Sequence, residues 1–225
     1  MTHVVHPYSH RLGIIKDWRS RWFGLKSKFT EYLKSDVLLR EYLEKRLKGM
    51  HVGYVEIERN AKILRVIIGT SRPGAIIGRS GEGSVKLRAD IEKEMRRLGI
   101  RGKEDLAIDI EEVRSPESNA LIVAQIVAEG LEKRMPFRRV LKQTIEKVMA
   151  NRDVKGVRIK LSGRLGGADM ARREQLMKGR IPLQTLRSDI DFARYRAKIA
   201  QGDLGIKVWI YRGDIFSENH GAKRQ

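Results

Sequence analysis

A glycine-rich tetrapeptide, Gly78-Arg79-Ser80-Gly81, follows a short apolar turn and precedes a helix-like stretch, and this arrangement narrows the possible folds sharply. The two glycines allow the backbone to approach a phosphate closely. The following helix presents free N–H groups, and Arg79 adds a positive charge, so the loop is suited to a sugar–phosphate backbone. Because glycine pairs are common in ordinary turns, the order of the flanking segments decides what the tetrapeptide means.

Before the loop, the residue pattern predicts a helix or a pair of helices, followed by two strands. Apolar residues in the range 29–47 fit a helix, which we expect to be interrupted near Ser35-Asp36 because this pair favours a helix start. The ranges 52–57 and 63–68 are rich in β-branched residues and predict two strands joined by a tight antiparallel turn.

After the loop, an apolar stripe that includes Leu87 and Ile91 predicts a second helix. Leu106, Ile108 and Ile110 then alternate with polar residues and predict a third strand with one solvent-exposed face. The full order is helix, strand, strand, short helix, glycine loop, helix, strand. This is the order of a type II KH domain, whose GxxG loop clamps about four nucleotides, so the tetrapeptide is predicted to bind RNA.

The second half of the chain predicts a separate α+β domain. A turn and helix-start signal at Ser115 marks the expected boundary. Two helices follow over 121–133 and 136–150, and alternating segments at 157–161 and 206–210 predict strands, with hairpin strands between them. The fold class is α+β, with a type II KH domain followed by two helices packed on a small, largely antiparallel sheet. The expected parts are a basic and aromatic arm (1–27), the KH domain (28–115), the C-terminal domain (116–216) and a disordered tail (217–225).

The charge of the chain points to a polyanionic partner. It has 47 Lys and Arg against 28 Asp and Glu, a formal net charge of +19 in 225 residues. Such a chain repels itself unless a polyanion neutralises it, and nucleic acid is the commonest polyanion in a cell. The cations are scattered rather than grouped on one amphipathic helix, which disfavours a membrane surface. Since the apolar runs are too short to span a bilayer, we expect a soluble, intracellular protein.

Several chemistries are excluded or disfavoured. The chain has no cysteine, which removes thiolate metal sites, iron–sulfur clusters and cysteine nucleophiles. It has no P-loop motif, and the glycine loop departs from a dinucleotide fingerprint. His3, His6 and His10 lie in the arm without a carboxylate cluster. Asp189 and Asp191 could hold Mg²⁺ for phosphodiester cleavage, but the arginines around them favour ion pairs. We therefore expect no catalytic residue, no metal and no cofactor.

Three cations share one face of the second helix in the C-terminal half. On an ideal helix, Arg138, Arg139 and Lys142 occupy an arc of roughly 100°. Glu146 is the one acid nearby in this helix, which favours a strip that faces phosphates over an ordinary solvated face. Further cations are predicted to bind RNA phosphates: Arg11, Lys16, Arg19, Arg158, Lys160, Arg164, Arg172, Arg173, Lys178 and Arg180. The arm that carries the first three either docks on RNA or on a neighbouring protein, or folds back on its own domain.

Several long motifs, in a fixed order, closely resemble the bacterial type of small-subunit ribosomal protein three. The resemblance covers the chain from the arm to about Phe216. The motifs are VHPxxxRLGIIxDW (5–18), PGxIIGRxGE (73–82), FRR (137–139), SGRLGGA (162–168), GRIPLxTLRxDID (179–191) and GIKVWI (205–210).

The resemblance implies a non-enzymatic component of the head of the small ribosomal subunit in the cytoplasm. It implies binding to small-subunit rRNA and contact with ribosomal proteins ten and fourteen. It also implies a place at the mRNA entrance, where Arg138, Arg139 and Lys142 line the channel and help keep mRNA single-stranded. Ser80 and Gln143 stand where relatives often carry a further basic residue, which would weaken those phosphate contacts.

Two alternatives belong to other functional classes. The first is a free-standing KH protein that acts as an assembly factor or a regulator and leaves the mature subunit. The second is a nuclease or abasic-site lyase that uses Asp189 and Asp191, or a lysine. Behaviour on a salt or sucrose gradient separates the first alternative from a stoichiometric ribosomal component, and cleavage of nucleic acid would support the second.

Overall fold

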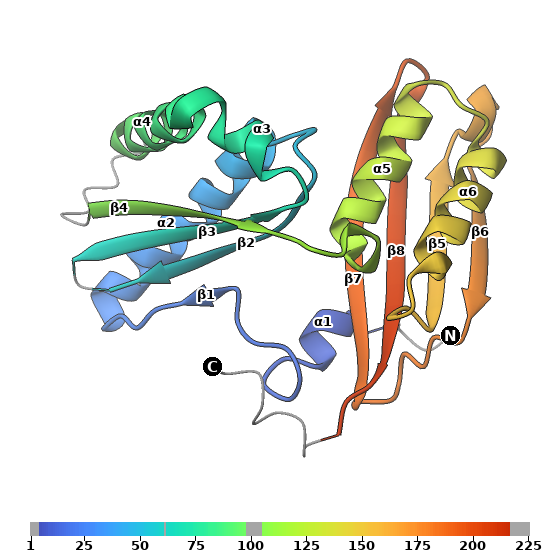
Figure 1. The fold of residues 1–225 in the computed structure, drawn as a ribbon, viewed down its shortest axis with the longest axis horizontal. Coiled ribbons are helices and arrows are strands. Elements are labelled where there is room, and N and C mark those ends of the chain that lie inside the picture. Colours follow the sequence, from blue (N-terminus) through green and yellow to red (C-terminus); the bar gives the residue numbers. More distant parts are fainter. Residues whose placement is uncertain (1–4, 61, 98–104, 217–225) are drawn as a thin grey trace. The chain divides into compact units, whose positions relative to one another are not determined.

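The structure is a computed structural model that describes residues 5–60, 62–97 and 105–216 (Figure 1). The chain divides into two compact units. One comprises Trp18–Arg114, and the other combines the described residues up to Asp17 with those from Ser115 on. The segment expected as one arm is thus shared between the two units, and the expected tail lies outside the described residues. In the described part of the chain, every helix is too short or too polar to cross a membrane.

The first unit is a four-stranded sheet that shares one hydrophobic core with three helices. Strand β1 is parallel to β2, β2 is antiparallel to β3, and β3 is parallel to β4. The predicted order of helices and strands is confirmed. The elements are β1 (Ser20–Arg21), α2 (Lys26–Arg46), β2 (Val52–Arg59), β3 (Ile63–Thr70), α3 (Pro73–Ile77), the 3₁₀ turn η1 (Arg79–Gly81), α4 (Glu82–Arg97) and β4 (Asp105–Glu112).

Helix α2 is continuous, so the predicted interruption near Ser35-Asp36 is wrong. Both residues are buried in the middle of the helix. The Ser35 hydroxyl donates to the Tyr32 carbonyl oxygen (2.8 Å) and accepts from the Arg59 guanidinium (2.8 Å). The Asp36 carboxylate accepts from the Trp22 indole N–H (2.7 Å) and lies 3.9 Å from the same guanidinium. These polar side chains hold other segments against the helix, and residue type alone does not distinguish that use from a helix cap.

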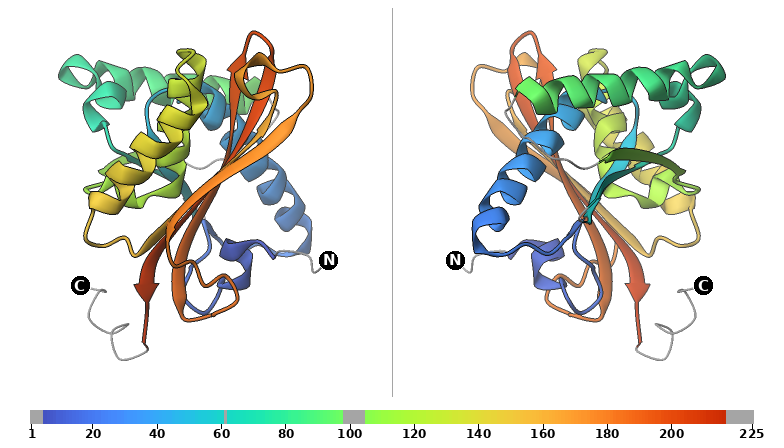
Figure 2. Two further views of the ribbon diagram at one scale, coloured as in Figure 1. Left: turned by 90° about the vertical axis from the view of Figure 1, so that its right-hand side faces the viewer. Right: turned by 90° about the vertical axis from the view of Figure 1, so that its left-hand side faces the viewer.

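The second unit is a four-stranded antiparallel sheet, with strand order β6-β5-β8-β7 and helices α5 and α6 on one face (Figures 1 and 2). The predicted pair of helices on an antiparallel sheet is confirmed. The elements are α1 (Pro7–His10), the 3₁₀ turn η2 (Pro116–Ser118), α5 (Ala120–Glu132), α6 (Phe137–Ala150), β5 (Gly156–Gly163), the 3₁₀ turn η3 (Leu165–Gly167), β6 (Arg172–Gly179), β7 (Ser188–Ile199) and β8 (Gly202–Asp214).

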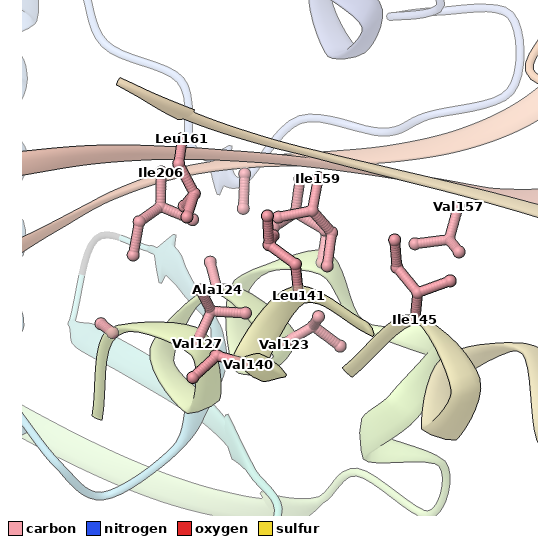
Figure 3. Packing of buried hydrophobic residues seen from close by; sticks show 14 of the residues in the cluster. Val123, Ala124, Val127, Val140, Leu141, Ile145, Val157, Ile159, Leu161 and Ile206 are labelled. Carbon is pink, nitrogen blue, oxygen red and sulfur yellow. The ribbon is translucent and has the colours of Figure 1, made fainter. Parts of the chain in front are cut away.

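Apolar residues at every second position of the strands form the core of this unit. Figure 3 shows side chains of α5 and α6, such as Val127 and Leu141, packed against Ile159 and Ile206 of the sheet. The strand residues at these positions are almost fully buried, and each such aliphatic side chain contributes about 1.5–3 kcal/mol by leaving water. Because side chains alternate in a strand, the intervening residues must point to the other face of the sheet, which we call the open face.

The arm covers one end of the open face. Ile190, Phe192, Trp209 and Tyr211 form a small buried cluster there. The imidazole of His6 meets the Phe192 ring edge-on, with 4.8 Å between ring centroids. Residues 5–17 therefore pack against the C-terminal sheet, whereas the interpretation from the sequence had the whole arm (1–27) folding back on its own domain.

Arg11, predicted as an RNA contact, is instead a buried anchor that is 0% exposed. Its guanidinium donates to the carbonyl oxygens of Ser188 (2.6 Å), Pro7 (3.1 Å), Leu183 (2.9 Å) and Thr185 (2.9 Å). The planar, five-donor group suits this set of acceptors because it reaches several of them at once. This placement removes Arg11 from the candidate RNA contacts and explains how the arm is held.

Arg11→Lys should destabilise the C-terminal unit by about 2–4 kcal/mol, because one ammonium cannot reach all these carbonyl oxygens and leaves buried acceptors unpaired. Urea unfolding measures the change. Arg180→Lys, at an exposed position of the same unit, is the matched control and should stay within about 0.5 kcal/mol of the parent. Equal stability of the two variants would contradict the anchoring role.

Candidate nucleic-acid interface

The glycine loop has the backbone geometry of an exposed clamp. Gly78 (φ 71°), Ser80 (φ 53°) and Gly81 (φ 83°) all lie at positive φ, where glycine is favoured and serine is strained. The loop is mostly exposed to solvent. Within the described residues, the exposed Arg79 side chain makes no hydrogen bond or ion pair, so its charge is available to a ligand. The loop therefore presents backbone and one cation to solvent, as phosphate binding requires.

Gly83, just after the loop, lets α4 approach α3 closely. A Cβ atom on Gly83 would clash with the Ile76 carbonyl oxygen and lie 2.9 Å from the Ile77 carbonyl oxygen. A Cβ on Gly78 would in turn lie 3.0 Å from the Gly83 nitrogen. The loop is thus fixed by close backbone packing at its base, which would position its exposed residues before a ligand arrives.

Helix α6 exposes the three predicted cations of the second unit. Arg138, Arg139 and Lys142 are exposed, while Val140 and Leu141 are buried against the core. The amphipathic helix therefore places the cations on solvent and its apolar residues on the sheet.

Strand β6 extends this cationic surface. The Glu174 carboxylate lies 3.6 Å from the Arg138 guanidinium and 3.5 Å from that of Arg172. Both guanidinium groups also lie over the Phe137 ring, at 5.6 and 5.5 Å from its centroid. One carboxylate and one aromatic ring thus hold cations of α6 and β6 side by side.

Neighbouring cations of β6 lie on opposite faces of the sheet. Leu176 packs against the core beneath the helices, so Arg172 and Lys178 share its face by alternation. Arg173 pairs in register with Ser162 and lies on the open face. The predicted RNA contacts of this strand therefore belong to two surfaces.

Two predicted contacts are engaged within the protein. The Lys16 ammonium pairs with Asp189 (2.7 Å) and is only partly exposed. Arg164 is exposed, and its guanidinium donates to the carbonyl oxygen of Ala168 (3.0 Å) and to the Asp169 carboxylate (3.2 Å). Lys16 helps fasten the arm, whereas Arg164 orders the turn after β5 and still reaches solvent.

The remaining predicted cations are accessible. Arg19 is exposed in the first unit, and its own carbonyl oxygen accepts from Arg40. Arg180 is exposed just after β6. Arg158 and Lys160 are half-buried in β5 on the open face, where the Arg158 guanidinium donates to Gln175.

The Asp189 and Asp191 carboxylates make contacts that stabilise the fold. Asp189 pairs with Lys16 and lies 3.7 Å from the Arg212 guanidinium. Asp191 accepts from the backbone N–H of Ala120 at the start of α5 (2.9 Å) and from Arg212 (3.1 Å). Both carboxylates are committed to ion pairs and a helix N-terminus, where negative charge is favourable.

No group of three His, Asp or Glu side chains in the described residues could hold a metal ion. His6 packs on Phe192 and accepts from the Tyr8 backbone N–H (3.2 Å), while His3 lies outside the described residues. His6 and His10, which the sequence did not favour as metal ligands, belong to no such group in the part of the chain that the structure describes.

Two cations on the open face, Lys207 and Arg194, were not predicted from the sequence as RNA contacts. Lys207 of β8 stands opposite Lys160 of β5 on one side and Arg194 of β7 on the other. Partial burial and the charges of Arg194 and Lys160 lower the pKa of Lys207. Alternation showed that Lys207 faces outward, but the register that aligns the three strands comes only from the tertiary structure.

The comparisons with known proteins agree with the two units. The KH domain family matches residues 38–118, and the family described as ribosomal protein S3, C-terminal domain, matches residues 127–210. A small ribosomal subunit protein uS3 from Caldicellulosiruptor saccharolyticus is 44% identical over 222 residues, covering 99% of this chain and 97% of the relative. The chain belongs to the uS3 family.

Other uS3 proteins show the same extent of similarity. That of Caldicellulosiruptor bescii is 42% identical and covers 100% of the chain and 98% of the relative. That of Pseudomonas paraeruginosa is 44% identical and covers 96% of the chain and 91% of the relative. The resemblance noted from the motifs is confirmed, and the family's non-enzymatic character agrees with the structural use of Asp189 and Asp191.

Gly83→Ala should destabilise the first unit by about 1–3 kcal/mol, because the added methyl group meets backbone oxygens that cannot move independently of α3. Gly74→Ala is the matched control, since a Cβ there has open space. It should be neutral or slightly stabilising in a helix. Chemical denaturation of both variants checks the difference, and equal midpoints would contradict the close packing at the loop base.

Proposed function

We propose that this chain, a structural component of the small ribosomal subunit, binds small-subunit rRNA in the subunit head and lines the mRNA entrance of the cytoplasmic ribosome. The observation that carries the proposal is the exposed strip Arg138, Arg139 and Lys142 on α6. Of these, Arg139 and Lys142 make no ion pair within the described residues. Glu174 lies near Arg138, but the charges of Arg139 and Lys142 are not balanced within the described residues, which suits a phosphate strand.

The strip supports a passive role in keeping mRNA single-stranded. Its cations address phosphates and not base edges, so binding is independent of sequence and sensitive to salt. Translocation supplies the work that opens a helix, and the cations disfavour re-pairing of the strand that has passed. Arg172, held beside Arg138 through Glu174, extends the same strip onto β6.

The GxxG loop supplies a second proposed contact with RNA backbone. Arg79 and the exposed glycines before α4 resemble the clamp that KH domains use. The close packing at Gly83 supports this use, because a loop held in place loses less entropy on binding.

An apolar stripe on α2 supports contact with neighbouring proteins. Phe29, Leu33 and Val37, at successive intervals of four residues, are each about half exposed (50%, 47% and 48%). Phe23 and Leu25, just before the helix, are 86% and 70% exposed. Exposed apolar side chains that share one face of a helix are typical of a protein contact. We propose ribosomal proteins ten and fourteen, the neighbours that the family resemblance implies, as its partners.

Neutralising the strip should impair passage through structured mRNA. Ribosomes that carry Arg138→Gln, Arg139→Gln and Lys142→Gln together should pass a stable mRNA hairpin roughly threefold to tenfold more slowly, because three exposed cation–phosphate contacts of under about 1 kcal/mol each are lost. Single-ribosome translation rates on a hairpin message measure this effect.

Two controls make the test specific. The same ribosomes should translate an unstructured message at the parent rate. A variant with Lys133→Gln and Arg152→Gln, which removes exposed charge outside the strip, should pass the hairpin normally. Unchanged hairpin passage by the triple variant would remove the channel role while leaving the structural role intact.

Sedimentation separates a resident component from a transient factor. In a sucrose gradient at high salt, the protein should remain at one copy per mature small subunit. Many phosphate contacts and protein contacts together keep it bound to the subunit. Quantitative mass spectrometry across the small-subunit peak gives the stoichiometry. Substoichiometric protein, or release into the top fractions, would favour the assembly-factor alternative.

A further inference from the structure

The open face of the C-terminal sheet carries a row of cations that run directly across three strands. Lys160 of β5, Lys207 of β8 and Arg194 of β7 are in register. Neighbouring strands lie about 4.8 Å apart, so the row spans roughly 10 Å. In the adjacent rows, Arg173 stands opposite Ser162 on one side, and Arg158 opposite Trp209 on the other. Five cations are thereby gathered from segments far apart in the sequence.

The row has no counter-charge in the described part of the chain. None of Lys160, Lys207 and Arg194 makes an ion pair there, whereas Arg196, further along β7, pairs with Asp203 (3.5 Å). Like charges placed directly opposite one another in a sheet are destabilising. Burial lowers the pKa of the Lys207 ammonium, and the charges of Arg194, Lys160 and Arg173 lower it further.

The sheet of the first unit provides an internal comparison. On the face away from its core, Arg21 pairs with Glu56 (2.6 Å) and Glu58 (2.8 Å), and Arg65 pairs with Asp109. There, every one of these cations has a carboxylate across the strands. The lack of carboxylates beside the row in the second unit is therefore not explained by the basic composition of the chain alone.

Buried aromatic rings support the edge of the row. The Arg194 guanidinium lies 5.5 Å from the Phe192 ring centroid, and that of Arg158 lies 5.1 Å from the Trp209 ring centroid. Both rings are only 7% exposed. The rings therefore restrict the guanidinium groups but offer no surface on which an unpaired base could stack.

We propose that this row, Lys160, Lys207 and Arg194 with Arg173 and Arg158 beside it, is a docking site for the phosphate backbone of an RNA duplex. The site is separate from the strip on α6, which lies on the other side of the sheet. The inference rests on the proposed function, because it names a second RNA surface of the same ribosomal component. It assigns RNA binding to Lys207 and Arg194, which sequence reasoning did not single out.

Duplex RNA fits this row of cations better than other polyanions do. A nucleic-acid duplex carries about one charge per 1.7 Å of axis, whereas an extended acidic peptide presents one face to a sheet only at every second residue, roughly 6.8 Å apart. The absence of exposed rings among the described residues of this row disfavours single strands, which bind largely by stacking. Double-stranded RNA is recognised mostly by shape and backbone contacts, which a flat cationic surface can make.

The test measures the full chain with two RNAs of equal length, one a perfect hairpin duplex and one an unstructured strand. Arg194→Gln with Lys207→Gln should weaken duplex binding roughly tenfold at 0.1 M KCl. The slope of log K against log[KCl] should fall in magnitude by about 1.8, since two phosphate contacts are lost. Binding of the single strand should change little. Fluorescence anisotropy gives all three quantities.

The thermal midpoint provides an independent readout. Removing two mutually repelling charges should raise the melting temperature of the free protein, so weaker RNA binding would accompany a more stable fold. Lys133→Gln with Arg152→Gln, the matched control at exposed positions away from the row, should leave the duplex affinity near that of the parent. A double variant that melts at a lower temperature than the parent would contradict the proposed repulsion between these charges.

The outcomes separate this inference from the proposed function. If the parent protein binds neither RNA, the proposed function itself fails. If the parent binds RNA and the Arg194/Lys207 variant binds the duplex equally well, only the docking site on the open face is overturned. An equal loss for duplex and single strand would show a general charge effect and would overturn the preference for duplex RNA.

Discussion

Burial of the alternating apolar residues of β5 and β8 beneath α5 and α6 is the constraint on which the C-terminal unit depends. Val157, Ile159 and Leu161 are almost fully buried, so Arg158 and Lys160 between them must lie on the opposite face. A shift of one residue in register would reverse every side chain, which makes this arrangement costly to change. The hydrophobic core thereby decides where the positive charge of the sheet is displayed.

The two sheets use charge differently, although they belong to one basic chain. In the first unit, carboxylates stand opposite Arg21 and Arg65 and balance them locally. In the second unit, most of the cations discussed on α6 and on the open face have no carboxylate beside them in the described part of the chain. Unpaired positive charge lowers the stability of the free protein and raises its affinity for a polyanion. This compromise suits a protein that works inside a ribonucleoprotein particle.

Several polar residues that suggested local roles are used in tertiary contacts instead. Ser35 and Asp36 look like a helix cap but lie in the middle of α2, where Arg59 and Trp22 supply their partners. Arg11 looks like an RNA contact but is enclosed by backbone carbonyl oxygens. In each case, the partner lies in another segment of the chain, and a local pattern contains no information about it. Burying such groups is possible only because those partners satisfy them.

The amino-acid sequence alone determined the order of helices and strands, the exposed GxxG loop, the cationic face of α6 and the uS3 family, because hydrophobic periodicity and contiguous motifs are local properties. Only the tertiary structure decided that Arg11 is buried, that Arg172 and Arg173 belong to opposite surfaces, and that Lys207 and Arg194 join Lys160 in one row. Those outcomes depend on strand register and on contacts between distant segments. Pairing of this kind is set by the packing of the whole unit, and neighbouring residues in the chain do not specify it.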